Sequence, residues 1–346
     1  MVFAALTRGL MAGLLATAVL MAAASSGRAQ SVADFYKGKT IDLYIGYSVG
    51  GAYDLYARQL ARHMGKHILG NPTILPKNME GAGSLRLANW LYNVGSKEGT
   101  AFGIIGRGTG FDPLLGNKAA QFDATKFTWI GSANNEVSIC VAWKTSGISK
   151  LEDTLTKELI VGGTGQAADT DQFPRILNGV LGTKFRIVTG YPGGNDVTMA
   201  MERGEVKGRC GWSWSSVLAT HKRWIDDNSI IILVQLSLSK HPDLADVPLV
   251  MDFAKSEDQQ QIFKLIFARQ VMGRPYLAPP GVPKDRADAL RKAFMDTMKD
   301  PEFLSDAEKS QLEINPVSGA EVEQLVKDIY QTPKALADKA AEYIRH

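Results

Sequence analysis

The feature of this chain that most restricts its fold is a junction of strand, glycine turn and helix in residues 41–54. Residues 41–47 are apolar enough for a buried strand, Gly50 and Gly51 form a turn, and helical spacing of apolar residues begins after Tyr53. The first backbone N–H groups of a helix lack partners within it, and the helix dipole is positive at that end. The junction therefore predicts an α/β protein with an anion-binding loop, for which a carboxylate is the natural ligand.

The same junction recurs along the chain. Short apolar strands end in glycine-rich turns at 81–83, 106–110, 162–165 and 190–195, and helical spacing follows most of them. In a parallel sheet such turns lie at the edge where open α/β sheets bind their ligands. The pattern starts again at residue 158, and 346 residues exceed what one core usually fills, so we expect two α/β lobes.

Composition and charge narrow the kind of partner. Hydrophobic residues make up 45% and charged residues 22% of the chain, which is typical of a globular protein. The formal net charge is +3, and it falls to +1 if Arg8 and Arg28 are removed with a leader. Such a weak charge does not favour nucleic acid or a membrane surface. We expect a small solute as the partner and no cofactor.

The N-terminal residues predict export. Arg8 precedes an uncharged apolar run at 9–24, and Gly27 and Ala29 supply small residues at the spacing of a cleavage site. The run of about 16 residues is shorter than the roughly 20 that a membrane-spanning helix needs. We therefore expect a signal peptide cleaved after Ala29 and a mature periplasmic protein that begins at Gln30.

The chain has two cysteines, Cys140 and Cys210, 70 positions apart in two apolar runs. An exported chain can oxidise such a pair to a disulfide, but the sequence leaves two buried free thiols as an equal alternative. Two separated cysteines do not form a ligand cluster, so no metal site is expected.

Several short segments follow one another in a fixed order from Phe35 to the C-terminus. They are FYKGKTI at 35–41, GGAYD at 50–54, NMEGAG at 78–83, GTAFG at 99–103, GYPGGN at 190–195, GEV at 204–206 and APPGVP at 278–283. This succession resembles the solute-binding proteins of tripartite tricarboxylate transporters, the TctC-like or Bug-type family.

The resemblance implies an α/β, two-lobed periplasmic binding protein fold of type II, also called the Venus-flytrap fold. It implies a first lobe at 30–138, a second lobe at 139–270, and a return to the first lobe with C-terminal helices at 271–346, after the signal peptide at 1–29. It also implies a receptor, not an enzyme, that closes over a small organic carboxylate and delivers it to membrane permease subunits. We expect a monomer.

The resemblance further implies that backbone amides and ordered waters hold the ligand carboxylate. Carried over position by position, the ligand-binding residues of the first lobe are Ser48, Gly50, Gly51, Tyr53, Asp54, Arg107 and Thr109. Those of the second lobe are Thr164, Gly165, Gln166, Gly193, Gly194, Asn195 and Trp212.

The chain departs from the family pattern in ways that point to its own substrate. Arg107 lies where relatives often have Thr or Ser followed by Pro, residues 166–170 lack the usual Ser-x-x-His, and Trp212-Ser-Trp214 replaces an Asp-Ser pair. Arg107 could pair with a second carboxylate or be a solvated loop residue. Asp54 could contact the ligand or only complement its own helix.

Trp212 and Trp214 lie two apart and share the parity of a strand, so both should face one side. They either form a flat apolar wall of the cleft or pack in the core. Two other patterns suggest an exported hydrolase or a nucleotide-cofactor enzyme as the alternative function. Gly163-x-Gly165-x-x-Ala168 resembles a dinucleotide fingerprint, and Gly211-x-Ser213-x-Ser215 resembles a nucleophile elbow without its last glycine.

Overall fold

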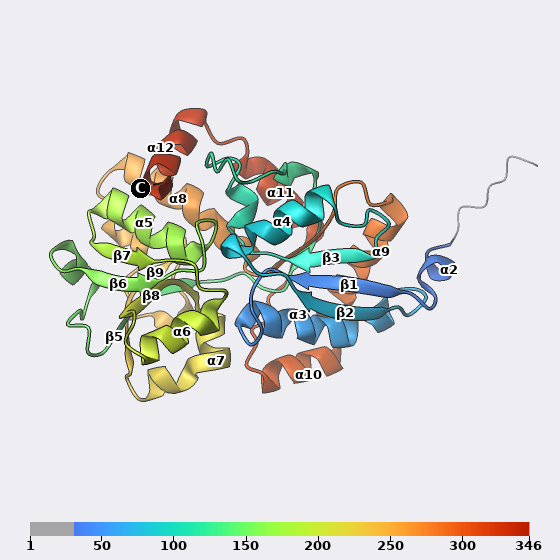
Figure 1. Cartoon of the computed structure of the whole chain (residues 1–346), viewed down its shortest axis with the longest axis horizontal. Coiled ribbons are helices and arrows are strands. Elements are labelled where there is room, and N and C mark those ends of the chain that lie inside the picture. Colours follow the sequence, from blue (N-terminus) through green and yellow to red (C-terminus); the bar gives the residue numbers. More distant parts are fainter. Residues whose placement is uncertain (1–30, 346) are drawn as a thin grey trace, which may run out of the picture.

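The computed structural model describes residues 31–345 (Figure 1). The predicted signal peptide therefore lies outside the described residues. Within the described part, the chain contains no helix with the length and apolar character needed to cross a bilayer.

The described residues form two α/β lobes, each built around one mixed sheet (Figure 1). The six-stranded sheet of the first lobe has the order β11-β4-β10-β3-β1-β2, and the five-stranded sheet of the second lobe has the order β7-β6-β8-β5-β9. The first sheet comprises β1 (Thr40–Ile45), β2 (Thr73–Asn78), β3 (Ala101–Ile104), β4 (Thr128–Ser132), β10 (Pro275–Ala278) and β11 (Val317–Ser318). The second comprises β5 (Ser138–Trp143), β6 (Leu159–Gly162), β7 (Phe185–Val188), β8 (Gly208–Ser213) and β9 (Ile230–Leu236).

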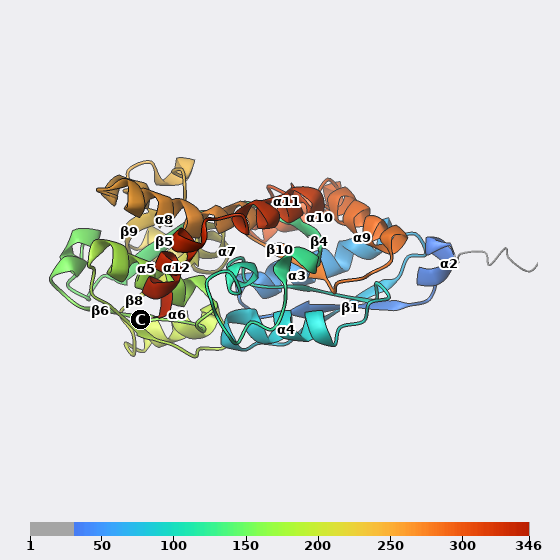
Figure 2. The ribbon, with the colours of Figure 1, turned by 90° about the horizontal axis from the view of Figure 1, so that it is seen from above.

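Helices cover both sheets, and the last one lies on the second lobe although the preceding helix belongs to the first. The first lobe carries α2 (Val32–Tyr36), α3 (Ala52–His63), α4 (Leu85–Asn93), α9 (Lys284–Thr297), α10 (Pro301–Lys309) and α11 (Gly319–Ile329). The second carries α5 (Asp169–Leu181), α6 (Gly194–Glu202), α7 (Trp214–Asp226), α8 (Glu257–Phe267) and α12 (Lys334–Arg345). Helix α12 packs against α5 and α8, as Figures 1 and 2 both show.

The direction of the strands explains where the loops gather. Strand β1 is parallel to β2 and β3, and β6 is parallel to β7 and β8. The carboxyl ends of parallel strands meet at one edge of a sheet, and there the chain turns into the helices that follow. In both lobes this edge faces the other lobe, so the starts of α3, α5 and α6 converge between the sheets.

Two of the segments that cross between the lobes lie side by side. The chain leaves the first sheet after Ser132 and enters the second at Ser138, and it returns between Met272 and Pro275. The Glu136 N–H donates to the Gln270 carbonyl at 2.8 Å, and the Gly273 N–H donates to the Asn134 carbonyl at 2.9 Å. We refer to these paired crossings as the hinge segments, and the residues between α11 and α12 join the lobes a third time.

Cys140 and Cys210 form a disulfide between the neighbouring strands β5 and β8. Both side chains are fully buried in the apolar core of the second lobe. Closing a loop of 70 residues restricts the unfolded chain, which by the chain-entropy argument stabilises the fold by about 4 kcal/mol.

We predict that reduction of the Cys140–Cys210 bond lowers the free energy of unfolding by about 2–4 kcal/mol. The measurement is denaturant unfolding with and without reductant, with thiol titration of the unfolded protein. The Cys140→Ala, Cys210→Ala double variant is the control, because its stability should not respond to reductant. Reactive thiols in unreduced, unfolded wild-type protein would contradict the bond.

Candidate functional site

A pocket lies between the lobes where the first turns of several helices meet. Residues Gly50 to Tyr53 at the start of α3 form one wall, and the starts of α5, α6 and α7 form the others. Each helix directs the positive end of its dipole to this region. The lining includes Tyr47, Gly50, Gly51, Ala52, Tyr53, Gly106, Arg107, Thr164, Ala168, Asp169, Thr170, Gly194, Asn195, Arg209, Gly211, Trp212, Ser213, Ser216, Thr220 and His221.

The residues predicted from the sequence divide into two groups. The pocket is lined by Gly50, Gly51, Tyr53, Arg107, Thr164, Gly194, Asn195 and Trp212. Outside its lining lie Ser48, Asp54, Thr109, Gly165, Gln166 and Gly193.

Several backbone amides that were expected to hold the ligand already have partners. The Gly50 N–H donates to Asp54 Oδ2 at 3.0 Å. In the second lobe the Thr164 N–H donates to Thr170 Oγ1 at 2.9 Å, and the Gly165 N–H donates to Asp171 Oδ2 at 3.0 Å. The amides of these three residues are therefore engaged within their own lobes.

Asp54 is the internal acceptor of the first-lobe loop. Its buried carboxylate also accepts hydrogen bonds from Arg58 Nε and Asn78 Nδ2, each at 2.9 Å. Burial by itself would raise the pKa of Asp54, but the hydrogen bonds from Arg58, Gly50 and Asn78 hold that pKa below its ordinary value. The Asp54 carboxylate is therefore engaged within the first lobe.

Ser48 and Thr109 also make contacts within the protein. Ser48 Oγ reaches across the cleft and donates to Asp196 Oδ2 at 2.7 Å. Asn195 Nδ2 donates back to the Val49 carbonyl at 3.0 Å, so the rims of the two lobes touch here. Thr109 Oγ1 lies 2.9 Å from Ser84 Oγ in the interior of the first lobe.

Three of the predicted residues have a role in backbone geometry and do not line the pocket: Gly165, Gln166 and Gly193. Gly165 has φ +136° and packs closely on the backbone of Ala82, so a side chain does not fit there. The Gln166 carbonyl accepts from Gln172 Nε2 at 3.1 Å, and Gly193 precedes the first turn of α6 as its N-cap.

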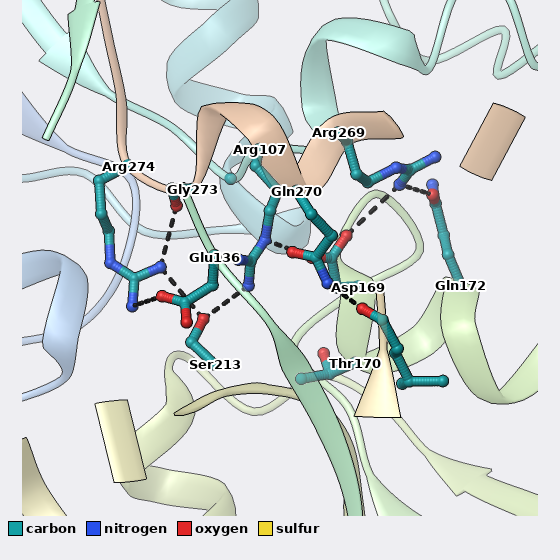
Figure 3. A network of polar contacts seen from close by, with 12 residues as sticks. Arg107, Glu136, Asp169, Thr170, Gln172, Ser213, Arg269, Gln270, Gly273 and Arg274 are labelled. Carbon is teal, nitrogen blue, oxygen red and sulfur yellow. Dashed lines mark hydrogen bonds and ion pairs between the residues drawn. The ribbon is translucent and has the colours of Figure 1, made fainter. Parts of the chain in front are cut away.

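The Arg107 side chain is buried and contacts the second lobe. It is 2% exposed, and its Nε donates to Asp169 Oδ2 at 2.6 Å across the cleft. Its Nη2 donates to Ser213 Oγ at 2.6 Å, also in the second lobe. The solvated-loop interpretation is therefore wrong, because the guanidinium joins the two lobes through a buried ion pair (Figure 3).

This ion pair belongs to a buried network beside the hinge (Figure 3). Arg274 Nη2 lies 3.3 Å from Glu136 Oε2, and its Nη1 donates to Ser213 Oγ at 3.1 Å. Arg269 Nη1 lies 3.4 Å from Asp169 Oδ1 on the other side. Sequence analysis missed Glu136, Asp169, Arg269 and Arg274, whose partners come from distant segments.

Arg209 differs from the other buried arginines of this region. It lies in β8, is 9% exposed and lines the pocket, yet no carboxylate of residues 31–345 is within ion-pair distance of it. Its Nη1 donates to the Gly194 carbonyl at 3.1 Å, its Nε has no acceptor in this part of the chain, and its guanidinium lies 4.6 Å from the centre of the Trp212 ring. Burial, aided by nearby Arg274 and Arg107, lowers the pKa of Arg209 to about 9.

Little in the sequence indicated this role for Arg209. Lys207 lies two residues before it in the run that contains Cys210 and Trp212, so a charged residue at this position did not stand out, although charged residues are rarely buried without a partner. The pocket therefore contains a buried cation whose compensating charge is not supplied by the described protein. That arrangement favours an anionic ligand.

The two tryptophans do not share one face. Strand β8 ends at Ser213, and Trp214 is the first residue of α7, so the strand parity assumed from the sequence is wrong. Trp214 Nε1 points to Asp243 Oδ2 at 3.4 Å, whereas Trp212 lines the pocket.

The two enzyme-like patterns lack their expected geometry. Ser215 Oγ donates to Glu136, and His221 Nδ1 contacts the neighbouring Thr220 hydroxyl at 2.7 Å, so among the described residues these serines and His221 form no Ser–His pair. The Gly163 N–H is bonded to the Val188 carbonyl, and the next two amides are engaged as described above. The turn therefore presents no row of free amides to a pyrophosphate.

Comparison with known proteins gives results for structures only. No family model matches the chain, and no curated protein sequence matches it. The structure of the periplasmic binding protein BugD covers 88% of this chain and 98% of its own, with 18% identity and a TM-score of 0.71. MatC from Rhodopseudomonas palustris with bound malate covers 86% and 99%, with 17% identity and a TM-score of 0.69. Rpa4515 from R. palustris with adipate covers 87% and 97%, with 15% identity and a TM-score of 0.67.

These likenesses confirm the fold that the sequence resemblance predicted. The chain has the two-lobed α/β fold of Bug-type and TctC periplasmic binding proteins, with a sequence that has diverged far from theirs.

Asp112 is a buried carboxyl group between the lobes whose protonation links the stability of the fold to pH. Its buried carboxyl group accepts from Gln172 Nε2 of the second lobe at 2.8 Å and from Asn117 Nδ2 at 3.3 Å. Burial raises the pKa of Asp112 to about 7, although Arg269 and these donors oppose the rise. The folded protein therefore keeps a proton that the unfolded chain releases above about pH 4.

We predict that the free energy of unfolding falls as pH rises from about 4 to 7, at up to about 1.4 kcal/mol per pH unit for this proton. The contribution of this proton to the free energy of unfolding is fully present below about pH 4, the pKa of Asp112 in the unfolded chain. It is lost as the pH rises through about 7, the pKa of Asp112 in the folded protein. Denaturant unfolding at several pH values would measure it, and Asp112→Asn should flatten the profile in this window. An equally steep profile in the variant would assign the effect to another group.

Proposed function

We propose that this protein is a periplasmic solute-binding receptor that captures a small organic carboxylate and delivers it to the permease subunits of a tripartite tricarboxylate-type transporter. The observation that carries this proposal is the Arg209 guanidinium, which is buried in the interlobe pocket without an acidic partner. A bound carboxylate would supply the missing negative charge and accept charge-assisted hydrogen bonds.

The surroundings of Arg209 support a ligand of this kind. The pocket also receives the start of α3, whose N-cap residue Gly51 makes no side-chain cap, so the first amides of this helix are open to an acceptor. Gly51 leaves the space in front of them free, since a Cβ there would meet atoms only at ordinary contact distance. An anion between Arg209 and α3 would be held from both lobes.

Binding from both lobes gives the receptor its mechanism. Lobe closure about the paired crossing segments brings Arg209 and α3 together, so a ligand that contacts both shifts the population toward the closed form. The permease then recognises that form. We propose lobe boundaries at 138/139 and 270/271, and a monomer that acts without a cofactor or catalytic step.

Proteins with this fold bind comparable molecules. The structures of MatC with malate and Rpa4515 with adipate carry carboxylates. They support the chemical class proposed for this chain, whereas the side chains of its own pocket decide which carboxylate fits.

We predict that Arg209→Met abolishes carboxylate binding while the free energy of unfolding of the ligand-free protein stays equal or rises. Removing a buried charge that has no partner relieves its desolvation cost, and the Met side chain fills similar space. Thermal-shift screening against mono-, di- and aromatic carboxylates, followed by calorimetry, measures binding. Denaturant unfolding measures stability.

Arg274→Met is the matched control. Arg274 is also buried, at 0% exposure against 9% for Arg209, but it is paired with Glu136, so its loss leaves an unpaired carboxylate and should cost about 3–5 kcal/mol of the free energy of unfolding. Gly194→Ala offers a second route, because a Cβ there would collide with the Arg209 guanidinium and displace it. An Arg209→Met protein that binds acids as the wild type does would refute the proposed site.

We predict that the protein recovered from a periplasmic extract begins at Gln30, because Gly27 and Ala29 satisfy the small-residue positions of the cleavage site. Intact-mass measurement decides this. A chain that starts at Met1 and stays in the membrane fraction would contradict both the signal peptide and the periplasmic location.

A further inference from the structure

Two guanidinium groups line the pocket, those of Arg107 and Arg209, and they differ in whether a carboxylate of the protein lies beside them. Arg107 is paired with Asp169 at 2.6 Å and also bonded to Ser213, although Asp169 is shared with Arg269. Among residues 31–345, Arg209 contacts the Gly194 carbonyl and the face of Trp212 but no carboxylate. Arg209 is therefore the guanidinium of the pocket wall to which one ligand carboxylate can supply the missing partner.

The hydroxyl groups of the pocket wall are engaged within the protein. Tyr47 Oη donates to the Gly83 carbonyl at 3.4 Å, and Tyr53 Oη accepts the Arg107 N–H at 3.3 Å. Thr170 Oγ1 accepts from Thr164, Ser216 Oγ accepts from Arg274, and Thr220 Oγ1 donates to the Ser216 carbonyl. Fewer partners are therefore left here for a second polar group on the ligand than water would give it.

Aromatic rings make up much of the remaining wall. The Tyr47 and Tyr53 rings of the first lobe are stacked with centroids 4.6 Å apart and an interplanar angle of 27°. The second lobe contributes Trp212, whose ring lies edge-on to His221 at 5.3 Å. Ala52 and Ala168 add small apolar surface. Such a wall favours a flat apolar body.

From this combination we infer that the ligand is an aromatic monocarboxylate, with its carboxylate on Arg209 and its ring between the tyrosine pair and Trp212. The inference rests on the proposed function and specifies its substrate class. It separates this chain from MatC with malate and Rpa4515 with adipate, since both of those ligands are aliphatic diacids.

Calorimetry on the mature protein with matched acids tests the inference. Benzoate, phenylacetate and 3-phenylpropanoate represent aromatic monoacids. Terephthalate and isophthalate add a second carboxylate, cyclohexanecarboxylate removes the flat ring, and adipate and malate represent aliphatic diacids. We expect the best aromatic monoacid to bind at least tenfold more tightly than any diacid and than its saturated counterpart.

Variants at the aromatic wall identify the contacts. Tyr53→Leu and Trp212→Leu should weaken benzoate-type acids by about tenfold and cyclohexanecarboxylate by much less, and Tyr53→Phe should retain wild-type affinity. Trp143→Leu is the control, because Trp143 packs on Trp224 in the same lobe but does not line the pocket. Tyr53 is only partly buried, so its variants keep the test available if Trp212→Leu does not fold.

The outcomes separate the two proposals. If a diacid or a saturated acid binds as tightly as the aromatic monoacids and Arg209→Met abolishes that binding, the substrate class is wrong and the proposed function stands. If no carboxylate of the panel binds the wild-type protein, the proposed function fails and the inference fails with it.

Discussion

The buried ion pair between Arg107 and Asp169 is the interaction on which the pocket depends. It joins the loop after β3 to the start of α5, and thus one lobe to the other, over 2.6 Å in an interior from which water is excluded. Asp169 is also shared with Arg269 beside the hinge. Because Asp169 is the partner of Arg107, Arg209 is left as the guanidinium of the pocket wall without a carboxylate partner among residues 31–345. Loss of Asp169 would leave both Arg107 and Arg269 without their carboxylate, so this residue sets the relative position of the lobes and the electrostatics of the site.

The backbone plan of the protein could be predicted from its sequence because it follows from local periodicity. Apolar runs, glycine turns and helical spacing predicted the strand now seen as β1 and the helix now seen as α3, and their repetition after residue 158 predicted the second lobe. The acceptors that occupy the loop amides were also local. Asp54, Thr170 and Asp171 each lie four to six residues after the amide they accept from, in the first turns of α3 and α5.

The chemistry of the pocket could not be predicted in the same way. Whether a buried arginine is paired depends on residues from other segments: Arg107 meets Asp169 over 62 positions, and Arg269 meets the same residue over 100. No rule of sequence spacing connects such residues. The family resemblance predicted which loops meet at the pocket, but it did not predict that Arg209 lies there or how the arginines are paired. Trp214 shows that a short-range prediction can fail as well. The chain changes from strand to helix after Ser213, so Trp214 does not face the side that strand parity predicted.

An unpaired cation also gives the proposed receptor a way to couple closure to binding. In the closed form Arg209 is buried and uncompensated, so that form carries a desolvation cost as long as the pocket holds no anion. Opening the cleft would rehydrate the guanidinium and relieve this cost, which favours the open form without ligand. A carboxylate removes the cost only in the closed form, where α3 and Arg209 both reach it. In the proposed receptor, the differential affinity of the carboxylate for that form would drive the lobes together, and a neutral molecule of the same shape would lack it.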